Sequence, residues 1–382
     1  ESKKKETEIM AFRVRGGIHP AYNKVTAHSP IEVLPAPKEL VIPLSQHIGA
    51  PCEPLVKVGD RVLLGQKIGD SQAPVSAPVH ATVSGTVKAV EPRWVPSGLR
   101  APCIVIENDF LDEKDPSYLD REDEFSFDAM TPEIICSRAR EAGIAGMGGA
   151  GFPTHIKLTP PVPVDTLILN GAECEPYLTC DDALMQGNRD EIVRGAKYMA
   201  KALGVSRILI AIEKNKPAAI AAFEGTEFDV VPLKKQYPMG AEKQLIYCCT
   251  GRKVPLGKLP AHAGVVVQNV ATAFAVCEAV ECGKPLIERV VTVTGGGIAQ
   301  PKNLICPVGT PLSALAEACG GERDAVKLVA GGPMTGTALT GTEAVVTKTT
   351  GGFLFLTAKE TNTDAPTPCI NCGRCAQVCP MK

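Results

Sequence analysis

The 382-residue sequence lacks any run of about eighteen consecutive apolar residues, the length a helix needs to cross a bilayer. Its most apolar stretch, residues 264–280, is interrupted by Gln268, Asn269 and Glu278. No segment has the pattern of a secretory signal peptide. We therefore expect a chain that does not span a membrane. Fifteen cysteines without a secretory context indicate a reducing compartment.

The sequence also lacks a strong charge of either sign. Forty Lys and Arg residues against forty-two Asp and Glu residues give a net charge of −2, so no nucleic-acid partner is expected. The only basic run, Lys3-Lys4-Lys5, is most simply a solvated terminus, and a weak contact with anionic lipid headgroups stays open. The apolar share of 45% is typical of a soluble globular protein, and the length suggests about two to four domains.

Four cysteines near the C-terminus form the strongest motif. Cys369, Cys372, Cys375 and Cys379, followed by Pro380, have the C-x2-C-x2-C-x3-C-P spacing of bacterial ferredoxins. Thiolates at this spacing suit a [4Fe–4S] cluster, which carries single electrons. A structural zinc site is the alternative, although zinc motifs usually place two C-x2-C pairs further apart. The other eleven cysteines are expected to be inert core thiols.

Residues 41–107 are rich in Val, Gly and Pro, with short alternating stretches. They resemble the barrel-sandwich fold of lipoyl and biotinyl carrier domains, which place a modified lysine at a hairpin tip. The corresponding span here, residues 71–80, contains no lysine. We therefore predict a structural barrel-sandwich module at 41–107, preceded by an N-terminal arm at 1–40, and we disfavour a biotin- or lipoyl-carrier protein.

An alternation of helices and strands follows an acidic segment at 108–130. A first helix is expected with Thr131 as its cap, Pro132 in its first turn and Gly143 at its end. The pattern predicts a second helix at 191–203 and strands at 165–169, 207–212, 227–233 and 264–268. This order predicts a Rossmann-like nucleotide domain at 130–285, although the G-x-G-x-x-G motif is lacking.

The pattern changes again after residue 285. Strands are expected at 290–294 and 304–308, and a short capped helix at 310–318, an order that suits a β-grasp module at 286–357. A polar linker leads to the cysteine segment at 365–382. The predicted fold class is therefore α/β with several domains.

A glycine-rich loop is the second strong motif. Gly148, Gly149 and Gly151 leave backbone N–H groups free of side chains, so the loop could wrap a phosphate or lie against a flat ring. Lys157 could meet the phosphate charge, and Phe152 could stack on a heterocycle. The alternative is a flexible turn in a scaffold without a cofactor.

Polar residues follow the strand at 165–169. Ligands bind at the carboxyl ends of strands in open α/β sheets, so Asn170, Glu173 and Glu175 are candidates for contacts with a flavin edge, ribose hydroxyls or an amide. A third segment, 237–244, opens a helix whose amino end could contact a dinucleotide.

These motifs resemble a known family. Gly-x-Gly-Gly-Ala-Gly-Phe-Pro-Thr-x-x-Lys, followed by Asn-x-x-Glu-x-Glu-Pro, resembles the flavin- and NADH-binding subunit of respiratory complex I. The run Gly16-Gly17-Ile18-His19-Pro20 and Lys24, with the carrier-like module and the ferredoxin motif, narrows the resemblance to the RnfC family, called RsxC in some bacteria. The resemblance covers nearly the whole chain.

The resemblance implies a peripheral electron-input subunit on the cytoplasmic face of the bacterial inner membrane. Such a subunit binds FMN non-covalently and NADH, contains an SLBB β-grasp module, and reaches the membrane only through its complex. Its implied partners are Rnf subunits A, B, D, E and G, and indirectly ferredoxin, with Na+ or H+ moved by the partners. Electrons would pass between NADH, FMN and the cluster, and hydride transfer needs no catalytic acid or base.

The resemblance also implies roles for individual residues. Those that match its FMN loop are Gly148, Gly149, Gly151 and Lys157. Phe152 matches an aromatic residue at its nicotinamide site, and Glu175 matches a position near NADH. Asn170 and Glu173 match its flavin-edge segment, and Asn269 matches an Asn that lies near the FMN. The residues that match its Tyr-x-x-Gly-Glu-Glu segment are Tyr237, Gly240 and Glu242, with Ala241 in place of the first Glu.

One departure from the family concerns the cysteines. The family has two ferredoxin motifs and two clusters, and this chain has one motif. In two-cluster ferredoxins the fourth cysteine ligates the other cluster. We therefore expect the natural chain to continue past Lys382, or a single cluster to use all four cysteines. The nearest rival family is the cobalamin-reducing flavin and iron–sulfur protein of microcompartments.

Overall fold

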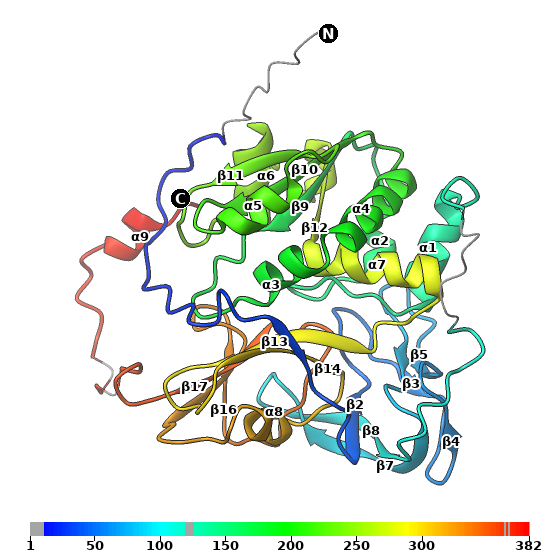
Figure 1. The fold of residues 1–382 in the computed structure, drawn as a ribbon. Coiled ribbons are helices and arrows are strands. Elements are labelled where there is room, and N and C mark those ends of the chain that lie inside the picture. The colour runs from blue at the N-terminus through cyan, green and yellow to red at the C-terminus, as the bar shows by residue number, and fades with distance from the viewer. Residues whose placement is uncertain (1–10, 119–125, 363, 366, 382) are drawn as a thin grey trace.

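The computed structural model describes residues 11–118, 126–362, 364–365 and 367–381 (Figure 1). The Lys3-Lys4-Lys5 run and part of the acidic segment lie outside these residues. In Figure 1 a parallel sheet with its helices fills the upper half, and the remaining sheets fill the lower half. Within the described residues, no helix combines the length and apolar character that crossing a bilayer requires.

The N-terminal module consists of two small antiparallel sheets. The first has the strand order β2-β8-β7-β4, and the second β3-β5-β6. Their bounds are Glu39–Pro43 (β2), Glu53–Pro54 (β3), Arg61–Val62 (β4), Lys67–Asp70 (β5), Val79–His80 (β6), Gly85–Trp94 (β7) and Arg100–Asn108 (β8). Leu40, Ile68, Val87 and Ile104 fill the core between them because alternate residues of each strand face inward.

The central domain is a four-stranded parallel sheet with the order β11-β10-β9-β12. Its strands are Thr166–Gly171 (β9), Arg207–Glu213 (β10), Asp229–Leu233 (β11) and Val265–Asn269 (β12), and each end lies within two residues of its predicted position. Leu167, Leu169 and Ile210 belong to the larger core on one face, and Ile168 and Leu209 belong to the core on the other. Both faces are therefore covered, as in doubly wound folds.

Helices cover the two faces unequally. The larger core contains residues of α1 (Pro132–Glu141), α3 (Cys180–Gly187), α4 (Arg189–Leu203), α5 (Pro217–Phe223) and α7 (Val270–Cys282). The other core contains residues of α6 (Glu242–Thr250). The first helix begins as predicted, because Thr131 accepts a hydrogen bond from the N–H of Ile134 and Pro132 occupies its first turn.

A six-stranded sheet with the order β1-β14-β13-β17-β15-β16 forms the C-terminal module. Its strands are Ile31–Val33 (β1), Glu288–Thr294 (β13), Lys302–Pro307 (β14), Lys327–Ala330 (β15), Thr337–Leu339 (β16) and Gly352–Leu356 (β17). Strand β1 comes from the predicted N-terminal arm and pairs in parallel with β14, a contact that the sequence did not suggest.

Helix α8 (Leu312–Ala318) packs Leu312 and Leu315 into the core of this sheet. The predicted side-chain cap of this helix is wrong. Pro311 occupies the cap position, and the hydroxyl of Thr310 instead donates to the backbone oxygen of Pro307 at 2.7 Å.

One buried lysine joins all three parts. The Nζ atom of Lys348, in the C-terminal module, donates to the backbone oxygens of Pro78 in the N-terminal module and Gly143 in the central domain, at 2.6 Å each. Burial lowers the pKa of Lys348 to about 7. Pro78 lies in the lysine-free hairpin span, so the position of that hairpin is fixed by the other domains.

The C-terminal segment lies outside these modules. From residue 367 to residue 378 every side chain is exposed, and the only helix there is α9 (Arg374–Val378). Its backbone is joined to the N-terminal arm by a hydrogen bond of 2.7 Å from the N–H of Gly17 to the oxygen of Val378. Figure 1 shows α9 beside this arm, away from the sheets.

Candidate functional site

The glycine-rich loop leads into the short helix α2 (Thr154–Lys157). The N–H of Gly146 donates to the oxygen of Phe152 at 2.8 Å, which closes the loop. The N–H of Met147 donates to the hydroxyl of Thr272, in the first turn of α7, at 3.0 Å. The loop is therefore tied at its base to the sheet domain.

The tip of this loop presents free backbone donors. Within the described residues, the N–H groups of Gly148, Gly149 and Ala150 donate to no protein acceptor. Gly148 has a φ of +75°, and a Cβ there would lie 2.8 Å from Nδ2 of Asn269, so a larger residue would be strained. A Cβ at Gly149 would meet nothing within 4 Å. These N–H groups form the kind of cradle that binds phosphates or a ring edge.

Two adjoining cavities meet at this loop, with volumes of about 520 and 540 Å³. The residues common to both linings are Gly148, Gly149, Ala150, Asn170, Gly240, Ala241 and Asn269. Those that line only the first cavity include Gly151, Phe152, Lys157 and Glu242, and those that line only the second include Glu173, Glu175 and Tyr237. The structure thus brings all the sequence-predicted flavin and NADH residues to the walls of these two cavities.

Neighbouring modules complete these walls. Ile48 of the N-terminal module lines the first cavity, and its N–H donates to the oxygen of Gly151 at 3.0 Å. Gly332 and Thr335 of the C-terminal module line the second cavity. Each cavity is therefore closed by a different module of the chain.

Asn170 and Asn269 are register partners at the carboxyl ends of β9 and β12. The amide of Asn170 donates to the oxygen of Gly240 at 2.9 Å, and its oxygen accepts from the N–H of Ala172 at 3.2 Å. The amide of Asn269 donates to Asp181 at 2.7 Å, and its oxygen caps α7. Both side chains thus hold neighbouring segments in place around the cavities.

Lys157 lies on the wall of the first cavity. Its Nζ donates to Oε1 of Glu242 and to the backbone oxygen of Val267, at 2.8 Å each. Glu242 begins α6, as the third predicted segment requires. An ammonium has three donors, so one N–H of Lys157 remains for a ligand.

Glu173 does not offer its carboxylate as an open acceptor, in contrast to the expectation from sequence. Its side chain is 4% exposed; Oε1 accepts from the N–H of Asp181 at 2.8 Å, and Oε2 lies 3.7 Å from Nζ of Lys24. Burial raises the pKa of Glu173 to about 7, although Lys24 opposes the rise. Glu173 and Lys24 are thus a buried pair, and Lys24 also contacts the backbone of the loop that contains Glu175.

Lys24 comes from the N-terminal arm and contacts the backbone of the loop that contains Glu173 and Glu175. Its Nζ also donates to the backbone oxygens of Glu173 and Glu175 at 3.0 Å each, and to that of Leu178. Burial lowers the pKa of Lys24, and the charge of Glu173 raises it. The arm is thus part of the site, which a single lysine in the sequence could not reveal.

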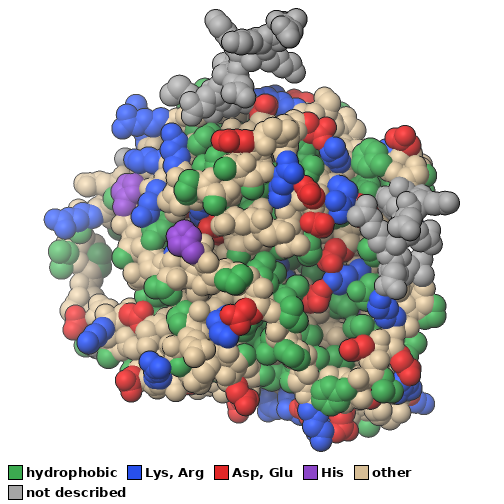
Figure 2. Space-filling view, viewed as in Figure 1, with side chains coloured by type: hydrophobic (Ala, Val, Ile, Leu, Met, Phe, Trp, Pro, Cys, Tyr) green, Lys and Arg blue, Asp and Glu red, His purple; other side chains and the backbone are tan. Residues whose placement is uncertain are grey.

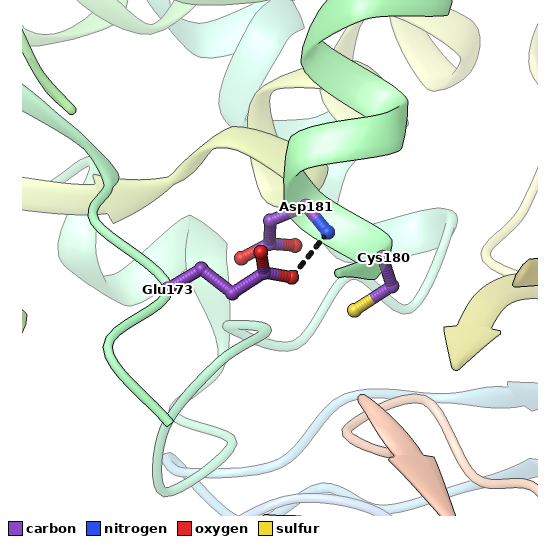
Figure 3. A group of neighbouring side chains, drawn as sticks. All are labelled: Glu173, Cys180 and Asp181. Carbon is purple, nitrogen blue, oxygen red and sulfur yellow. Dashed lines mark hydrogen bonds between the residues drawn. The ribbon is translucent and has the colours of Figure 1, made fainter. Parts of the chain in front are cut away.

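Glu173, Cys180 and Asp181 place one ligand atom each within 4.8 Å of one another (Figure 3). Such a group could hold a metal ion in principle. Here each carboxylate already has a protein donor or cation, since Glu173 faces Lys24 and Asp181 accepts from Asn269. We therefore interpret the group as a buried polar network that supports the site.

Glu175 lies on the rim between two modules. Its Oε2 accepts from the N–H of Met334 at 3.0 Å, and its Oε1 accepts from the hydroxyl of Thr335 at 2.5 Å. Met334 and Thr335 belong to the loop between β15 and β16. The carboxylate expected near NADH is therefore held by the C-terminal module, at the second cavity.

The four motif cysteines lie apart from these cavities. Cys369, Cys372 and Cys375 are exposed, and Cys379 is half-buried. Within the described residues, no three of their sulfurs come within 4.8 Å of one another. Their segment thus lies at one edge of the molecule, and its sulfurs do not form a cluster-ligand arrangement in the described residues. Of the remaining cysteines, all except Cys136, Cys174 and Cys282 are buried.

Comparisons with known proteins match this arrangement. Residues 139–278 match the family described as the Nuo51 FMN-binding domain, and residues 12–111 match the RnfC barrel sandwich hybrid domain. One solved structure, an NAD+-reducing [NiFe]-hydrogenase in its H2-reduced state, has a TM-score of 0.50 at 24% identity, over 60% of this chain and 47% of that chain. That likeness concerns the fold alone.

Three curated relatives are similar over almost the whole chain, and each is the C component of its complex. That of the proton-translocating ferredoxin:NAD(+) oxidoreductase complex of Clostridium ljungdahlii is 46% identical, over 96% of this chain and 81% of its own length. That of the Na(+)-translocating complex of Acetobacterium woodii is 45% identical, over 96% and 84%. That of the ion-translocating oxidoreductase complex of Rhodobacter capsulatus is 46% identical, over 98% and 73%. The chain therefore belongs to the RnfC family, whose members are components of the ion-translocating ferredoxin:NAD+ oxidoreductase, or Rnf, complex.

Proposed function

We propose that this chain is the electron-input subunit of an Rnf complex, which exchanges electrons between NADH and the partner subunits through FMN and iron–sulfur centres. The observation that carries the proposal is the cradle of free N–H groups at Gly148, Gly149 and Ala150, set where two cavities meet. The match of residues 139–278 to an FMN-binding domain supports the same ligand.

The residues present fit a bound FMN. The free N–H groups and the remaining donor of Lys157 supply the positive field that a phosphate or a reduced ring needs. Gly151 has a φ of +71°, and a Cβ there would lie 2.8 Å from Cγ2 of Thr349, so a larger residue at this position of the loop would be strained. When bound, FMN accepts a hydride and releases its two electrons one at a time.

The chain's own residues then bind and orient the dinucleotide. We propose that Phe152 packs at the nicotinamide side, and that Tyr237, Gly240 and Glu242 form the wall that receives the rest of NADH. Glu175 stands at the rim of the second cavity, where its carboxylate could exchange Thr335 for a hydroxyl of the ligand. Glu173, Asn170 and Asn269 act indirectly, because their polar atoms already hold the frame. No acid or base is needed for the transfer.

Cys369, Cys372, Cys375 and Cys379 are proposed to ligate a [4Fe–4S] cluster, whose chemistry is the transfer of single electrons. From the family we also propose that the partners are subunits A, B, D, E and G, and that electrons are exchanged indirectly with ferredoxin. We propose that the chain lies on the cytoplasmic face of the cell membrane. The C-terminal module, 286–357, is proposed to be of the SLBB β-grasp type.

FMN binding to Lys157→Ala tests this proposal. Loss of a charged hydrogen bond to the ligand should weaken FMN binding roughly 10- to 100-fold. Fluorescence quenching of FMN by the flavin-free chain gives the affinity. Lys197→Ala is the matched control, since Lys197 also forms an ion pair with a glutamate, Glu227, on an exposed surface. Equal FMN affinities of the two variants would show that Lys157 does not contact FMN. A folded wild-type chain that binds no FMN would overturn the proposed function.

A further inference from the structure

A third cavity lies away from the flavin site, between the N-terminal arm and the ends of β10 and β11. It has a volume of about 870 Å³ and shares no lining residue with the two flavin cavities. We call it the basic groove. Its lining is mixed, and its less polar members include Phe12, Met239, Tyr247 and Cys248.

Basic side chains line this groove. Arg13, Arg15 and His19 on the arm, and Lys214 and Lys234 at the strand ends, line it and are exposed. In the part of the chain that the structure describes, none of the five lies within 4.0 Å of a carboxylate oxygen. Figure 2 shows basic side chains gathered at the upper left, the side where the arm and α9 lie in Figure 1. Since the whole chain has a net charge of −2, this patch is a local feature.

The cysteine segment is fastened to the edge of the same groove. Gly16 lines the groove, and a Cβ on it would lie 2.7 Å from the oxygen of Val378 and 3.1 Å from Pro380. The next residue, Gly17, donates to Val378. Glycines at these two positions allow the arm and the cysteine segment to touch backbone to backbone. The end of the cysteine segment, at Val378 and Pro380, thus adjoins the basic groove.

We propose that the basic groove and the adjoining cysteine segment are the docking surface for the acidic face of a partner protein that contains a one-electron redox centre. This inference rests on the proposed function, because it requires that electrons leave the chain through the cysteine segment. Exposed cations beside apolar lining residues attract and then retain an acidic protein surface. The exposed side chain of Phe12 favours a protein over an anionic lipid headgroup, which would need the cations alone.

The proposal is tested with the FMN- and iron-loaded chain, NADH, and the soluble domain of an acidic cytochrome b5 as acceptor. One NADH is oxidised to NAD+ and H+ while two ferric cytochromes are reduced to the ferrous state. The variant Arg15→Glu/Lys234→Glu changes both sides of the groove. The control Lys57→Glu/Lys327→Glu makes the same charge change at two exposed lysines in other modules, which also form no ion pair within the described residues.

At low salt, the rate of cytochrome b5 reduction by the groove variant should be lower than that of the control by a factor of roughly ten or more. The two rates should converge near 1 M salt, where the screening length is about 3 Å. With basic cytochrome c as acceptor, the groove variant should be equal to the control or faster. Flavin bleaching by NADH should be the same in wild type, variant and control.

Other outcomes would overturn the proposal. Equal cytochrome b5 rates for the groove variant and the control would exclude docking at the groove. A raised KM for NADH in the groove variant would assign the groove to the dinucleotide. Loss of binding to phosphatidylglycerol vesicles with an unchanged cytochrome b5 rate would assign it to lipid. If NADH bleaches no flavin in any chain, the proposed function itself fails, which is a separate result.

Discussion

The glycine-loop site and the cysteine segment differ in how the chain holds them. The first is built from three modules around a buried ion pair, and nearly every polar side chain in it has a protein partner. The second is exposed from residue 367 to residue 378 and is fastened chiefly through Val378 and Pro380. Under the proposed function, a hydride acceptor needs a fixed geometry and a one-electron donor needs to meet a partner, and the two regions suit these tasks.

Lys24→Met should have the largest effect, because it removes a buried cation from the glycine-loop site. Lys24 is 8% exposed, faces Glu173 and donates to three backbone oxygens, so its loss leaves several buried acceptors without a donor, with an expected cost of about 3–5 kcal/mol in the free energy of unfolding. Urea unfolding measures the change. Lys38→Met is the control, because Lys38 is 78% exposed in its ion pair and should cost less than about 1 kcal/mol. Similar losses in both variants would contradict a supporting role for Lys24.

Glu173→Gln should change how the stability of the glycine-loop site depends on pH. The folded-state pKa of Glu173 is about 7 against an ordinary value of 4.5, so the folded chain holds a proton that the unfolded chain releases in this interval. Wild-type stability should therefore fall as pH rises from about 4.5 to about 7, by about 3 kcal/mol at most relative to the variant. Denaturant unfolding across this pH range measures it. Parallel pH profiles for the two chains would show that Glu173 does not titrate there.

Gly149→Leu should separate ligand binding from folding within the glycine-loop site. A Cβ at Gly149 meets no protein atom within 4 Å, so the flavin-free chain should keep its melting temperature. The added bulk should hinder approach of a ligand to the free N–H groups and weaken FMN binding roughly tenfold, or about 1.4 kcal/mol. Gly187→Leu, at another glycine with open surroundings, is the control. An unchanged FMN affinity would show that the ligand does not lie against Gly149.

Cys375→Ser should have the smallest effect on the folded body. Because Cys375 is exposed on α9, the unfolding free energy of the other modules should change by less than about 0.5 kcal/mol. FMN content should stay the same while bound iron falls. Iron and flavin assays on anaerobically purified protein check both expectations, with Cys103→Ser as a buried contrast that should cost stability and leave iron unchanged. Loss of flavin together with iron would indicate that the two regions are not independent.

Much of the fold could be predicted because the relevant signals are local. The four strands of the parallel sheet follow from short apolar runs, and Thr131 and Pro132 mark the start of a helix. The place of residues 31–33 could not be predicted, because β1 pairs with β14 across some 270 residues of chain. Long-range pairing leaves no local pattern in a three-residue strand.

The sequence predicted which residues line the site better than it predicted the contacts that they make. The glycine loop, Asn170, Glu175 and Asn269 do meet at the two cavities, because parallel strands end at one edge of a sheet. The inward turn of Glu173 was not predictable, since it depends on Lys24, which is 149 residues distant. Ile48 and Thr335 were missed for the same reason, as each comes from a module that the sequence shows no reason to place at the flavin cavities.

An anaerobic titration of the FMN- and iron-loaded chain with NADH tests the central claim most directly, read by flavin absorbance and by electron paramagnetic resonance of the iron centre. The account predicts that NADH bleaches the flavin and that a reduced iron–sulfur signal then appears. It predicts that Gly149→Leu loses both responses in proportion to its flavin content, while Cys375→Ser keeps the bleaching and loses the iron signal. A folded, flavin-loaded chain whose absorbance NADH leaves unchanged would contradict the account.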